Sequence, residues 1–118
     1  MSAETAEQAA LVGRLRSLRV AEPSVREGSM FGGRSIMVNE KMIVAAQKDG
    51  ALLVRVAADR HADLLTMPGA AQAEMGPGRD MGPGWIDVAP AAIADDDGLA
   101  FWVAAAMEHN RAVTDGAV

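Results

Sequence analysis

Short apolar runs separated by polar pairs dominate the stretch from residue 30 to residue 56. The runs are Ile36–Val38, Met42–Ala46 and Leu52–Val56, and the breaks between them are Asn39-Glu40 and Asp49-Gly50. Runs of this length between turn-forming residues are typical of β-strands. An Asp-Gly pair is a strong hairpin signal, because both residues tolerate positive φ. The pattern predicts an antiparallel meander.

The first half of the chain is expected to hold four strands, at Val25–Phe31, Ser35–Val38, Met42–Gln47 and Ala51–Val56. Gly32 and Gly33 follow the first of them. Two adjacent glycines permit backbone angles that other residues avoid, so we expect a bulge or a tight turn there. A further strand is predicted at Trp85–Val88, with its first and third side chains on one face. The Gly/Pro-rich connection before it, residues 69–84, has room for a short strand near Gln72–Met75.

Three helices are expected. The first spans residues 4–20, where leucines recur at intervals of three and four, and Pro23 ends it because the residue before a proline avoids the helical conformation. The second spans residues 60–66, with Asp59 as its cap. The third spans residues 97–112 and begins at one of three consecutive aspartates, Asp95, Asp96 and Asp97. Its inward stripe is Leu99, Trp102, Val103, Ala106 and Met107.

The coarse order of elements is therefore α-β-β-β-β-α-β-α. Consecutive strands with helices at the ends and between them indicate a two-layer α+β domain, an antiparallel meander sheet with helices mainly on one face. A length of 118 residues fits a single domain over residues 1–118. Its ordered core is expected over residues 4–112.

The strands do not alternate cleanly between apolar and polar residues. Met42, Val44 and Ala46 would share one face of a regular strand. Ile43 then makes the opposite face apolar as well, and Leu53 does the same in the next strand. A sheet with one face in water should alternate, so both faces are expected to be at least partly covered. Two arrangements remain open: a partner or second copy covers the second face, or the sheet curves and the C-terminal segment folds across it.

The composition indicates in which cellular compartment the protein is expected. Half of the residues are hydrophobic, yet no run approaches the ~18 apolar residues of a membrane span. No cysteine is present, which excludes disulfides, thiolate nucleophiles and cysteine-based zinc sites. The N-terminus begins polar and acidic, unlike a secretory signal. We expect a soluble, cytoplasmic protein with no membrane partner.

The net charge of −5 is unevenly spread. Residues 1–60 hold nine of the eleven Lys and Arg and seven of the sixteen acids, whereas residues 61–118 hold two basic and nine acidic residues. An acidic chain repels the phosphate backbone, so direct nucleic-acid binding is not expected. The alternative is phosphate contact through arginines of the first half, namely Arg14, Arg16, Arg19 and Arg26.

No constellation of side chains predicts an active site. His61 and His109 stand far apart without cysteine partners and are expected at the surface. The three consecutive aspartates suit a helix N-terminus better than a calcium loop, whose carboxylates alternate. Gly76–Gly84 fits no phosphate-loop pattern, and its prolines remove N–H donors. We expect no enzymatic activity, no cofactor and no metal.

Five segments occur in a characteristic order: Met30-Phe31-Gly32-Gly33, Asn39-Glu40-Lys41-Met42, residues 49–56, Gly78–Trp85 and Leu99–Val103. Together they resemble the N-terminal domain of the TfoX/Sxy family, over residues 8 to 112. The resemblance implies an α+β domain with an antiparallel sheet, in agreement with the hydrophobic pattern. The Asn39-Glu40 turn departs from the family by lacking its usual glycine.

Full-length members of that family regulate bacterial natural competence, are thought to act alongside the cyclic-AMP receptor protein, and carry a second, helical domain. The sequence ends at Val118, so a single-domain version of the module is expected from the resemblance. The resemblance to the family carries over no catalytic residues.

We therefore expect a non-enzymatic protein-interaction module that binds a protein partner or a second copy of itself as a homodimer. The candidate interaction surface comprises Met30, Phe31, Gly32, Gly33, Ile43, Leu53, Arg79, Asp80 and Trp85. The alternative is a small-molecule-binding protein or minor enzyme. In that case a pocket between sheet and helices would be lined by methionines and by Trp85 or Trp102.

Overall fold

The computed structural model describes residues 6–18, 25–30, 33–38, 41–47, 49–76 and 78–116. In chain order, the elements are α1 (Ala6–Leu18), β1 (Val25–Met30), β2 (Gly33–Val38), β3 (Lys41–Ala46), β4 (Leu52–Arg55), the 3-10 helix η1 (Ala58–Arg60), α2 (His61–Leu64), β5 (Ala70–Gln72), β6 (Glu74–Gly76), β7 (Arg79–Asp80), β8 (Trp85–Val88), the 3-10 helix η2 (Pro90–Ile93) and α3 (Asp96–Gly116).

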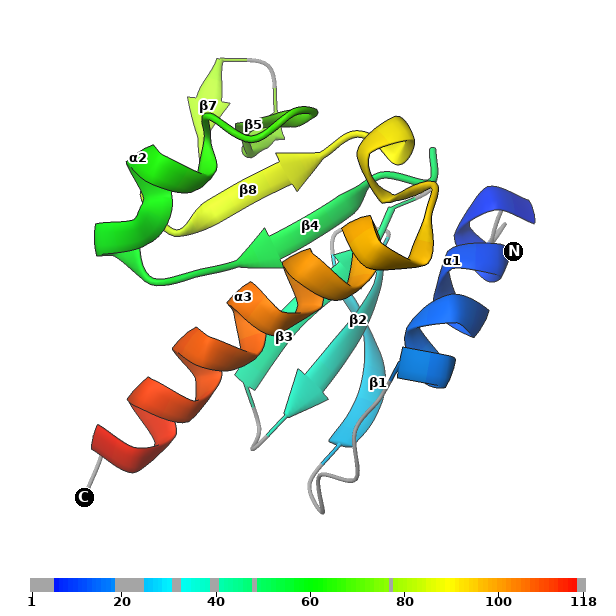
Figure 1. The fold of residues 1–118 in the computed structure, drawn as a ribbon, viewed down its shortest axis with the longest axis horizontal. Helices are drawn as coiled ribbons and strands as arrows, with labels where there is room; N and C mark the ends of the chain where they lie inside the picture. The colour runs from blue at the N-terminus through cyan, green and yellow to red at the C-terminus, as the bar shows by residue number, and fades with distance from the viewer. Residues whose placement is uncertain are drawn as a thin grey trace.

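Six of the strands form one antiparallel sheet in the order β1-β2-β3-β4-β8-β5, and β6 and β7 form a separate hairpin. Figure 1 shows α3 running diagonally across one face of the sheet, with α1 beside it on the same face. The predicted two-layer α+β fold is confirmed.

The ends of several elements differ from the prediction. Met30 is the last residue of β1 and pairs with Gly33, so the bulge or turn predicted at Gly32-Gly33 lies in part outside the described residues. The 69–84 connection holds three short strands where one was expected, and β5 joins the edge of the main sheet. Helix α3 extends further toward the C-terminus than predicted.

The caps of the two later helices differ in kind. Asp95 caps α3 as predicted, because its Oδ1 accepts a hydrogen bond of 2.8 Å from the Gly98 N–H. Asp59 does not cap the short helical region. It lies inside η1, and neither η1 nor α2 has a side-chain hydrogen bond at its N-cap.

The main core lies between the sheet and the helices. The central strands contribute Leu52, Val54, Ile86 and Val88, all fully buried, α1 contributes Leu11, Val12 and Leu15, and α3 contributes Leu99, Trp102, Ala106 and Met107. Each helix thus buries a stripe spaced at three and four residues, as its sequence predicts. Val103, predicted as part of the α3 stripe, is only partly buried and packs at the margin of this core.

Two buried amide side chains fix the helices on the sheet. Gln8 of α1 donates from Nε2 to the carbonyl oxygen of Ala46 at 2.8 Å. Asn110 of α3 donates from Nδ2 to the carbonyl oxygen of Val38 at 2.9 Å. Both side chains are 2% exposed, so these bonds satisfy polar groups that would otherwise be buried without a partner.

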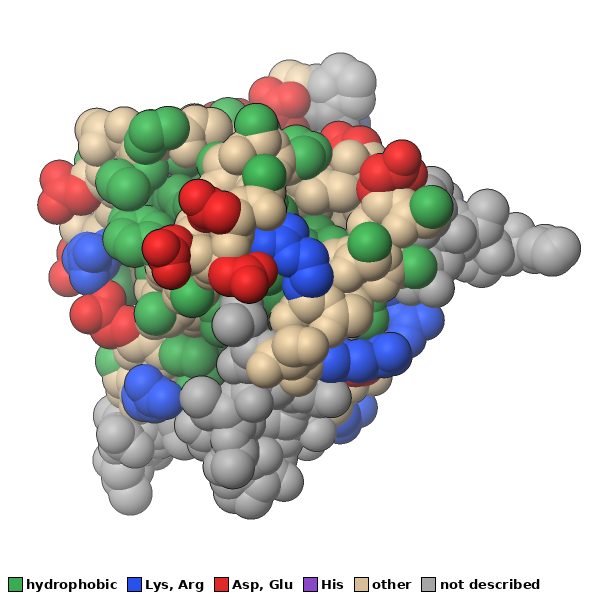
Figure 2. Space-filling model, turned by 45° about the vertical axis from the view of Figure 1, so that its right-hand side comes forward, with side chains coloured by type: hydrophobic (Ala, Val, Ile, Leu, Met, Phe, Trp, Pro, Cys, Tyr) green, Lys and Arg blue, Asp and Glu red, His purple; other side chains and the backbone are tan. Residues whose placement is uncertain are grey.

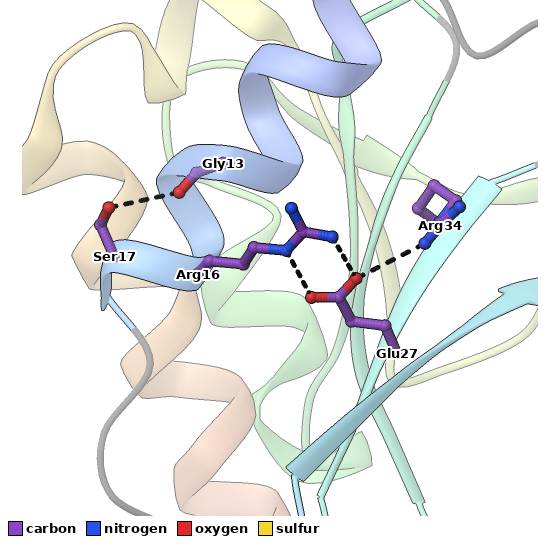
Figure 3. A network of polar contacts seen from close by, with 5 residues as sticks. All are labelled: Gly13, Arg16, Ser17, Glu27 and Arg34. Carbon is purple, nitrogen blue, oxygen red and sulfur yellow. Dashed lines mark hydrogen bonds and ion pairs between the residues drawn. The ribbon is translucent and has the colours of Figure 1, made fainter.

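A network of charged side chains ties α1 to the edge of the sheet (Figure 3). Arg16 donates from Nε and Nη2 to the two carboxylate oxygens of Glu27, at 2.7 and 2.8 Å. Arg34 of β2 donates to the same carboxylate at 3.5 Å. The two-pronged geometry of Arg16 fixes both distance and orientation between helix and strand.

Strand β3 carries one extra residue opposite β2. Ile36 pairs with Val44, and the next residue of β2, Met37, pairs with Met42, so Ile43 is the inserted residue of a β-bulge. Ile43 and Val44 consequently both belong to the main core, while Met42 belongs to a cluster on the other side of the sheet. The prediction that placed Met42 with Val44 and put Ile43 on the opposite face was wrong, since it assumed a regular strand.

Candidate functional site

A second hydrophobic cluster lies on the sheet face opposite α1 and α3. Its buried members are Met42, Ala45, Leu53 and Ala73, and Met37, Met81 and Trp85 pack against them partly buried. Ala73 and Met81 belong to the 69–84 connection and are joined by a hydrogen bond of 2.9 Å from the Met81 N–H to the Ala73 carbonyl oxygen. The second face is therefore partly covered, as predicted. Among the described residues, this cover comes from the 69–84 connection.

Strands β3 and β4 separate beside this second cluster. They pair over only three positions, from Ala46–Leu52 to Val44–Val54. Beyond that point β3 continues along β2 as far as Lys41, and β4 continues along β8 as far as Arg55. In Figure 1 the two strands run apart behind the C-terminal half of α3. The β-bulge at Ile43 lies at the point where β3 and β4 separate. A bulge bends the strand that carries it, which accounts for the separation.

A cavity of about 350 Å³ lies at this separation. It is lined by Met37, Lys41, Met42, Arg55, Trp85, His109, Asn110 and Val113. The first five come from the strands and the last three from one side of α3, spaced as neighbours on a helix face. The bond from Asn110 to the Val38 carbonyl holds this part of α3 against the sheet. The cavity thus has walls from both layers of the fold.

The guanidinium of Arg55 is held in place from two sides. It lies over the ring of Trp85, 4.8 Å from the ring centroid, which is a cation–π arrangement. On another side is Gly84, where a Cβ would come within 2.8 Å of Arg55 Nη1. The backbone of Gly84 has φ +93°, a conformation that favours glycine. Gly84 therefore leaves the space that the guanidinium occupies.

The titratable group of the α3 wall is His109. Its burial lowers the pKa below the usual range, the charge of Arg55 lowers it further, and Asp59 acts in the opposite direction. The ring is therefore mostly neutral at neutral pH. No carboxylate is among the eight side chains that line the cavity. The described lining of the cavity thus holds a guanidinium and an ammonium group beside an imidazole that is mostly neutral at neutral pH.

A carboxylate does lie elsewhere on the second face, at Asp87 of β8. Burial raises its pKa above the usual range, a hydrogen bond of 2.8 Å from Gln47 Nε2 opposes this, and the charge of Asp49 adds to it. Asp87 pairs with Leu53 in the sheet and does not line the cavity.

The predicted interaction residues fall in different places. Met30 and Gly33 pair with one another at the β1–β2 end, and Phe31 and Gly32 lie outside the described residues. No described contact brings this family-like segment to the cavity.

The remaining predicted residues divide three ways. Ile43 is 4% exposed and packs in the main core, so it offers no surface to a partner. Arg79 and Asp80 form β7 and are exposed, outside the second cluster and the cavity lining. Leu53 and Trp85 lie in the second cluster, and Trp85 also lines the cavity. The interaction role of Leu53, Arg79, Asp80 and Trp85 remains a prediction.

Sequence reasoning missed most of the cavity, namely Lys41, Arg55, His109, Asn110 and Val113. Lys41 begins β3 and Arg55 ends β4, so a signal did exist: each is a cation at the end of an apolar run. The spacing of His109 and Val113 along α3 places them on one face, but nothing in it indicates a cavity.

His61 was predicted at the surface but has a structural role in a half-buried position. The Gly84 N–H donates to its Nδ1 at 2.8 Å, so Nε2 carries the ring proton and donates to Gln72 Oε1, also at 2.8 Å. This latch joins α2 to the segment that supports Arg55. Within the described residues, no group of three potential metal ligands occurs.

The arginines considered for phosphate contact are partly engaged within the domain. Arg14 donates to the Asp95 carbonyl oxygen at 3.1 Å and pairs with Asp96 at 3.4 Å, while Arg16 holds Glu27. Arg19 lies outside the described residues. Figure 2 shows acidic and basic side chains next to one another on this side of the molecule. The expectation against direct nucleic-acid binding stays a prediction.

Fold and cavity define a small α+β domain with a cavity lined by strands of the sheet and by α3. The sequence model of the TfoX N-terminal domain matches residues 18–110 of the chain, and the chain therefore belongs to the TfoX N-terminal domain family. This confirms the resemblance found in the five segments and supports a TfoX-like regulatory module. No curated protein matches the chain significantly. In the part of the chain that the structure describes, none of the helices has the length and apolar character needed to cross a membrane.

Proposed function

We propose that this chain is a non-enzymatic regulatory module that binds a small molecule in the cavity between β3, β4 and α3. The observation that carries the proposal is the cavity itself, about 350 Å³ with walls from both layers. Pockets of this size, mostly apolar with a few convergent polar groups, are typical of small-ligand sites. Trp85 and the methionines Met37 and Met42 supply the apolar wall, and Arg55 supplies a positioned charge.

The chemistry of the lining supports binding over catalysis. Guanidinium and ammonium groups act as hydrogen-bond donors only, and thioether and indole groups do not titrate near neutral pH. His109 is the one lining side chain suited to proton transfer near neutrality. General acid–base catalysis usually pairs such a group with a nucleophile or a second base, and the eight lining residues include neither.

A ligand in this cavity would touch the separated ends of β3 and β4 and the last turns of α3 together. Its binding free energy would therefore stabilise one arrangement of α3 relative to the sheet. A protein partner that contacts α3 or the sheet could then bind the ligand-bound and ligand-free domain with different affinity.

The test is a thermal-shift screen of small metabolites on three proteins. Val113→Trp places a large side chain at the cavity wall, whereas Ala112→Trp places it on the exposed neighbouring position of α3. A ligand of the cavity stabilises the native state by about 2.7 kcal/mol at roughly a hundred times its Kd. We expect melting temperatures to rise for the wild type and Ala112→Trp but not for Val113→Trp. A screen without hits, or hits that Val113→Trp retains, would contradict the proposal.

A second candidate function is the binding of a protein partner on the second face. Met37, Met81 and Trp85 are large, half-buried side chains of the second cluster, which has no member from the described residues of α1 or α3. Methionine-rich surfaces adapt well to apolar segments of other proteins. Under this proposal, exclusion of water from these side chains drives the association.

Site-specific photocrosslinking tests this second function. A crosslinker at position 81 is expected to form an adduct with one protein species, and a crosslinker at the exposed position 63 on α2 is not. Met37→Lys should suppress the adduct. An adduct with a second copy would show self-association, while equal adducts from both positions, or a strictly monomeric protein with none, would count against the surface.

A further inference from the structure

We infer that the cavity takes a small organic anion, whose carboxylate or phosphate head lies between Arg55, Lys41 and His109 and whose apolar body packs on Met37, Met42 and Trp85. This inference rests on the proposed function of the cavity as a ligand site. It goes beyond that function by assigning the chemical class of ligand.

The first argument is the charge of the lining. Two permanent cations and an imidazole come together from β3, β4 and α3, in a chain whose net charge is −5. The described residues provide no hydrogen-bond or ion-pair partner for the Arg55 guanidinium, which contacts the face of Trp85 instead. A guanidinium without a carboxylate partner at the wall of a cavity is suited to bind an anion from solution.

The second argument is that Arg55 is pre-positioned. The Trp85 ring holds one side of the guanidinium, and the absence of a side chain at Gly84 admits it on another. The His61 latch fixes Gly84 in turn, through the bond to its N–H. A donor held in this way loses little conformational entropy when it binds a ligand, so more of the interaction energy appears as affinity.

The third argument concerns the body of the ligand. Met37, Met42, Trp85 and Val113 give the cavity an apolar wall next to the cationic groups. A bare inorganic anion would leave that wall in contact with water. An anion with an aromatic or aliphatic body uses both parts of the cavity, and the volume of about 350 Å³ suits a small organic molecule.

The titration of His109 gives the site a characteristic response to pH. In the free protein the pKa of His109 is lowered, with burial and Arg55 acting against protonation and Asp59 in favour of it. Lys41 is the other cation of the lining. A bound anion favours the imidazolium and raises the pKa of His109. Anion affinity should therefore increase as the pH falls through the pKa of the bound state.

The experiment uses NMR titration of the full chain with phenylacetate and its neutral analogue phenylacetamide, and with phenyl phosphate and inorganic phosphate. Phenylacetate or phenyl phosphate is expected to shift the indole signal of Trp85 and the side-chain amide of Asn110. The two probes distinguish a carboxylate from a phosphate head. Phenylacetamide and inorganic phosphate, each lacking one half of the ligand, should bind at least about tenfold more weakly.

Variants assign the effect to named charges. Arg55→Met is expected to weaken the organic anion about tenfold or more and to leave phenylacetamide unchanged. Lys41→Met removes the other cation of the lining and should weaken the organic anion as well. Its side chain is exposed, so the change carries no risk to the fold. Arg79→Met removes an arginine outside the cavity and should change nothing. As the pH is lowered from about 7.5 to about 5.5, the affinity of the wild type for phenylacetate should rise. His109→Gln should remove most of that pH dependence.

The outcomes separate the inference from the function on which it rests. If phenylacetamide binds as tightly as phenylacetate and shifts the same signals, the cavity binds ligands but the anion assignment fails. If Arg79→Met weakens the anions as much as Arg55→Met, the binding is non-specific surface attraction and the inference fails as well. If no probe moves a cavity signal and the metabolite screen is also flat, both proposals fall.

Discussion

Replacing Gly84 by alanine should remove about 3 kcal/mol or more of the free energy of unfolding. The residue has φ +93°, where an L side chain is strained. Its new Cβ would also meet the carbonyl oxygen of Val56 at 2.7 Å and Arg55 Nη1 at 2.8 Å. The Val56 oxygen is backbone and is tied to this segment, because the Val56 N–H donates to the Gly84 carbonyl at 2.8 Å. The backbone oxygen cannot move away cheaply, and the Arg55 guanidinium would have to leave its place over Trp85.

Gly82 provides the matched control. It has nearly the same φ, +92°, but nothing lies within 4 Å of a Cβ built there. Gly82→Ala should therefore lose only the backbone contribution, about 1–2 kcal/mol. Urea denaturation of the two variants measures the difference directly. Equal losses would show that the close approach to Val56 and Arg55 contributes nothing to stability.

This prediction gives a physical reason for one of the family-like segments. In Gly78–Trp85, the last two residues are the glycine that admits Arg55 and the tryptophan on which its guanidinium lies. From the sequence, Gly76–Gly84 could be said only to fit no phosphate-loop pattern. The structure adds that Gly84 and Trp85 support a charged side chain from another strand.

Local patterns predicted most of the fold because local physics determines those elements. The Asp49-Gly50 turn forms as expected: Gly50 has φ +87°, and the Asp49 carboxylate accepts a hydrogen bond of 3.0 Å from the Ala51 N–H. The stripe of α3 buries Leu99 and Trp102 as the spacing of three and four requires. By contrast, β5 consists of Ala70–Gln72, too short and too small to show alternation, and only its pairing with β8 makes it a strand.

The candidate site could not be predicted because it depends on where two strands separate. The sequence showed that β3 and β4 are apolar on both faces. The bulge that changes the facing of Ile43 and Met42 is a property of the pairing with β2, so the β3 sequence alone does not show it. The cavity then brings Arg55 next to His109, a residue from the far end of the chain. A pocket lined by methionines and Trp85 was an open alternative, but its cations were not foreseen.

The bulge itself leads to the second large effect. Ile43→Glu is expected to abolish cooperative folding, because it places a carboxylate in the main core, where Ile43 is 4% exposed. Burial of an unpaired charge costs several kcal/mol, a large part of the roughly 5–15 kcal/mol that stabilises a domain. Far-UV circular dichroism during thermal unfolding would show the loss of a sharp transition.

Met42→Glu, at the adjacent position, is expected to keep the fold, with a change within about 2 kcal/mol. Met42 is 8% exposed in the second cluster, but it also lines the cavity together with Arg55 and Lys41, so the new carboxylate would have two cations as partners. A regular strand would reverse the outcome. Met42 would then share the helix-covered face with Val44, and Ile43 would lie on the opposite face. In the bulged strand, the introduced carboxylate should also occupy the place of an anionic ligand and weaken phenylacetate binding. The pair of variants therefore tests both the bulge and the charge of the cavity that it opens.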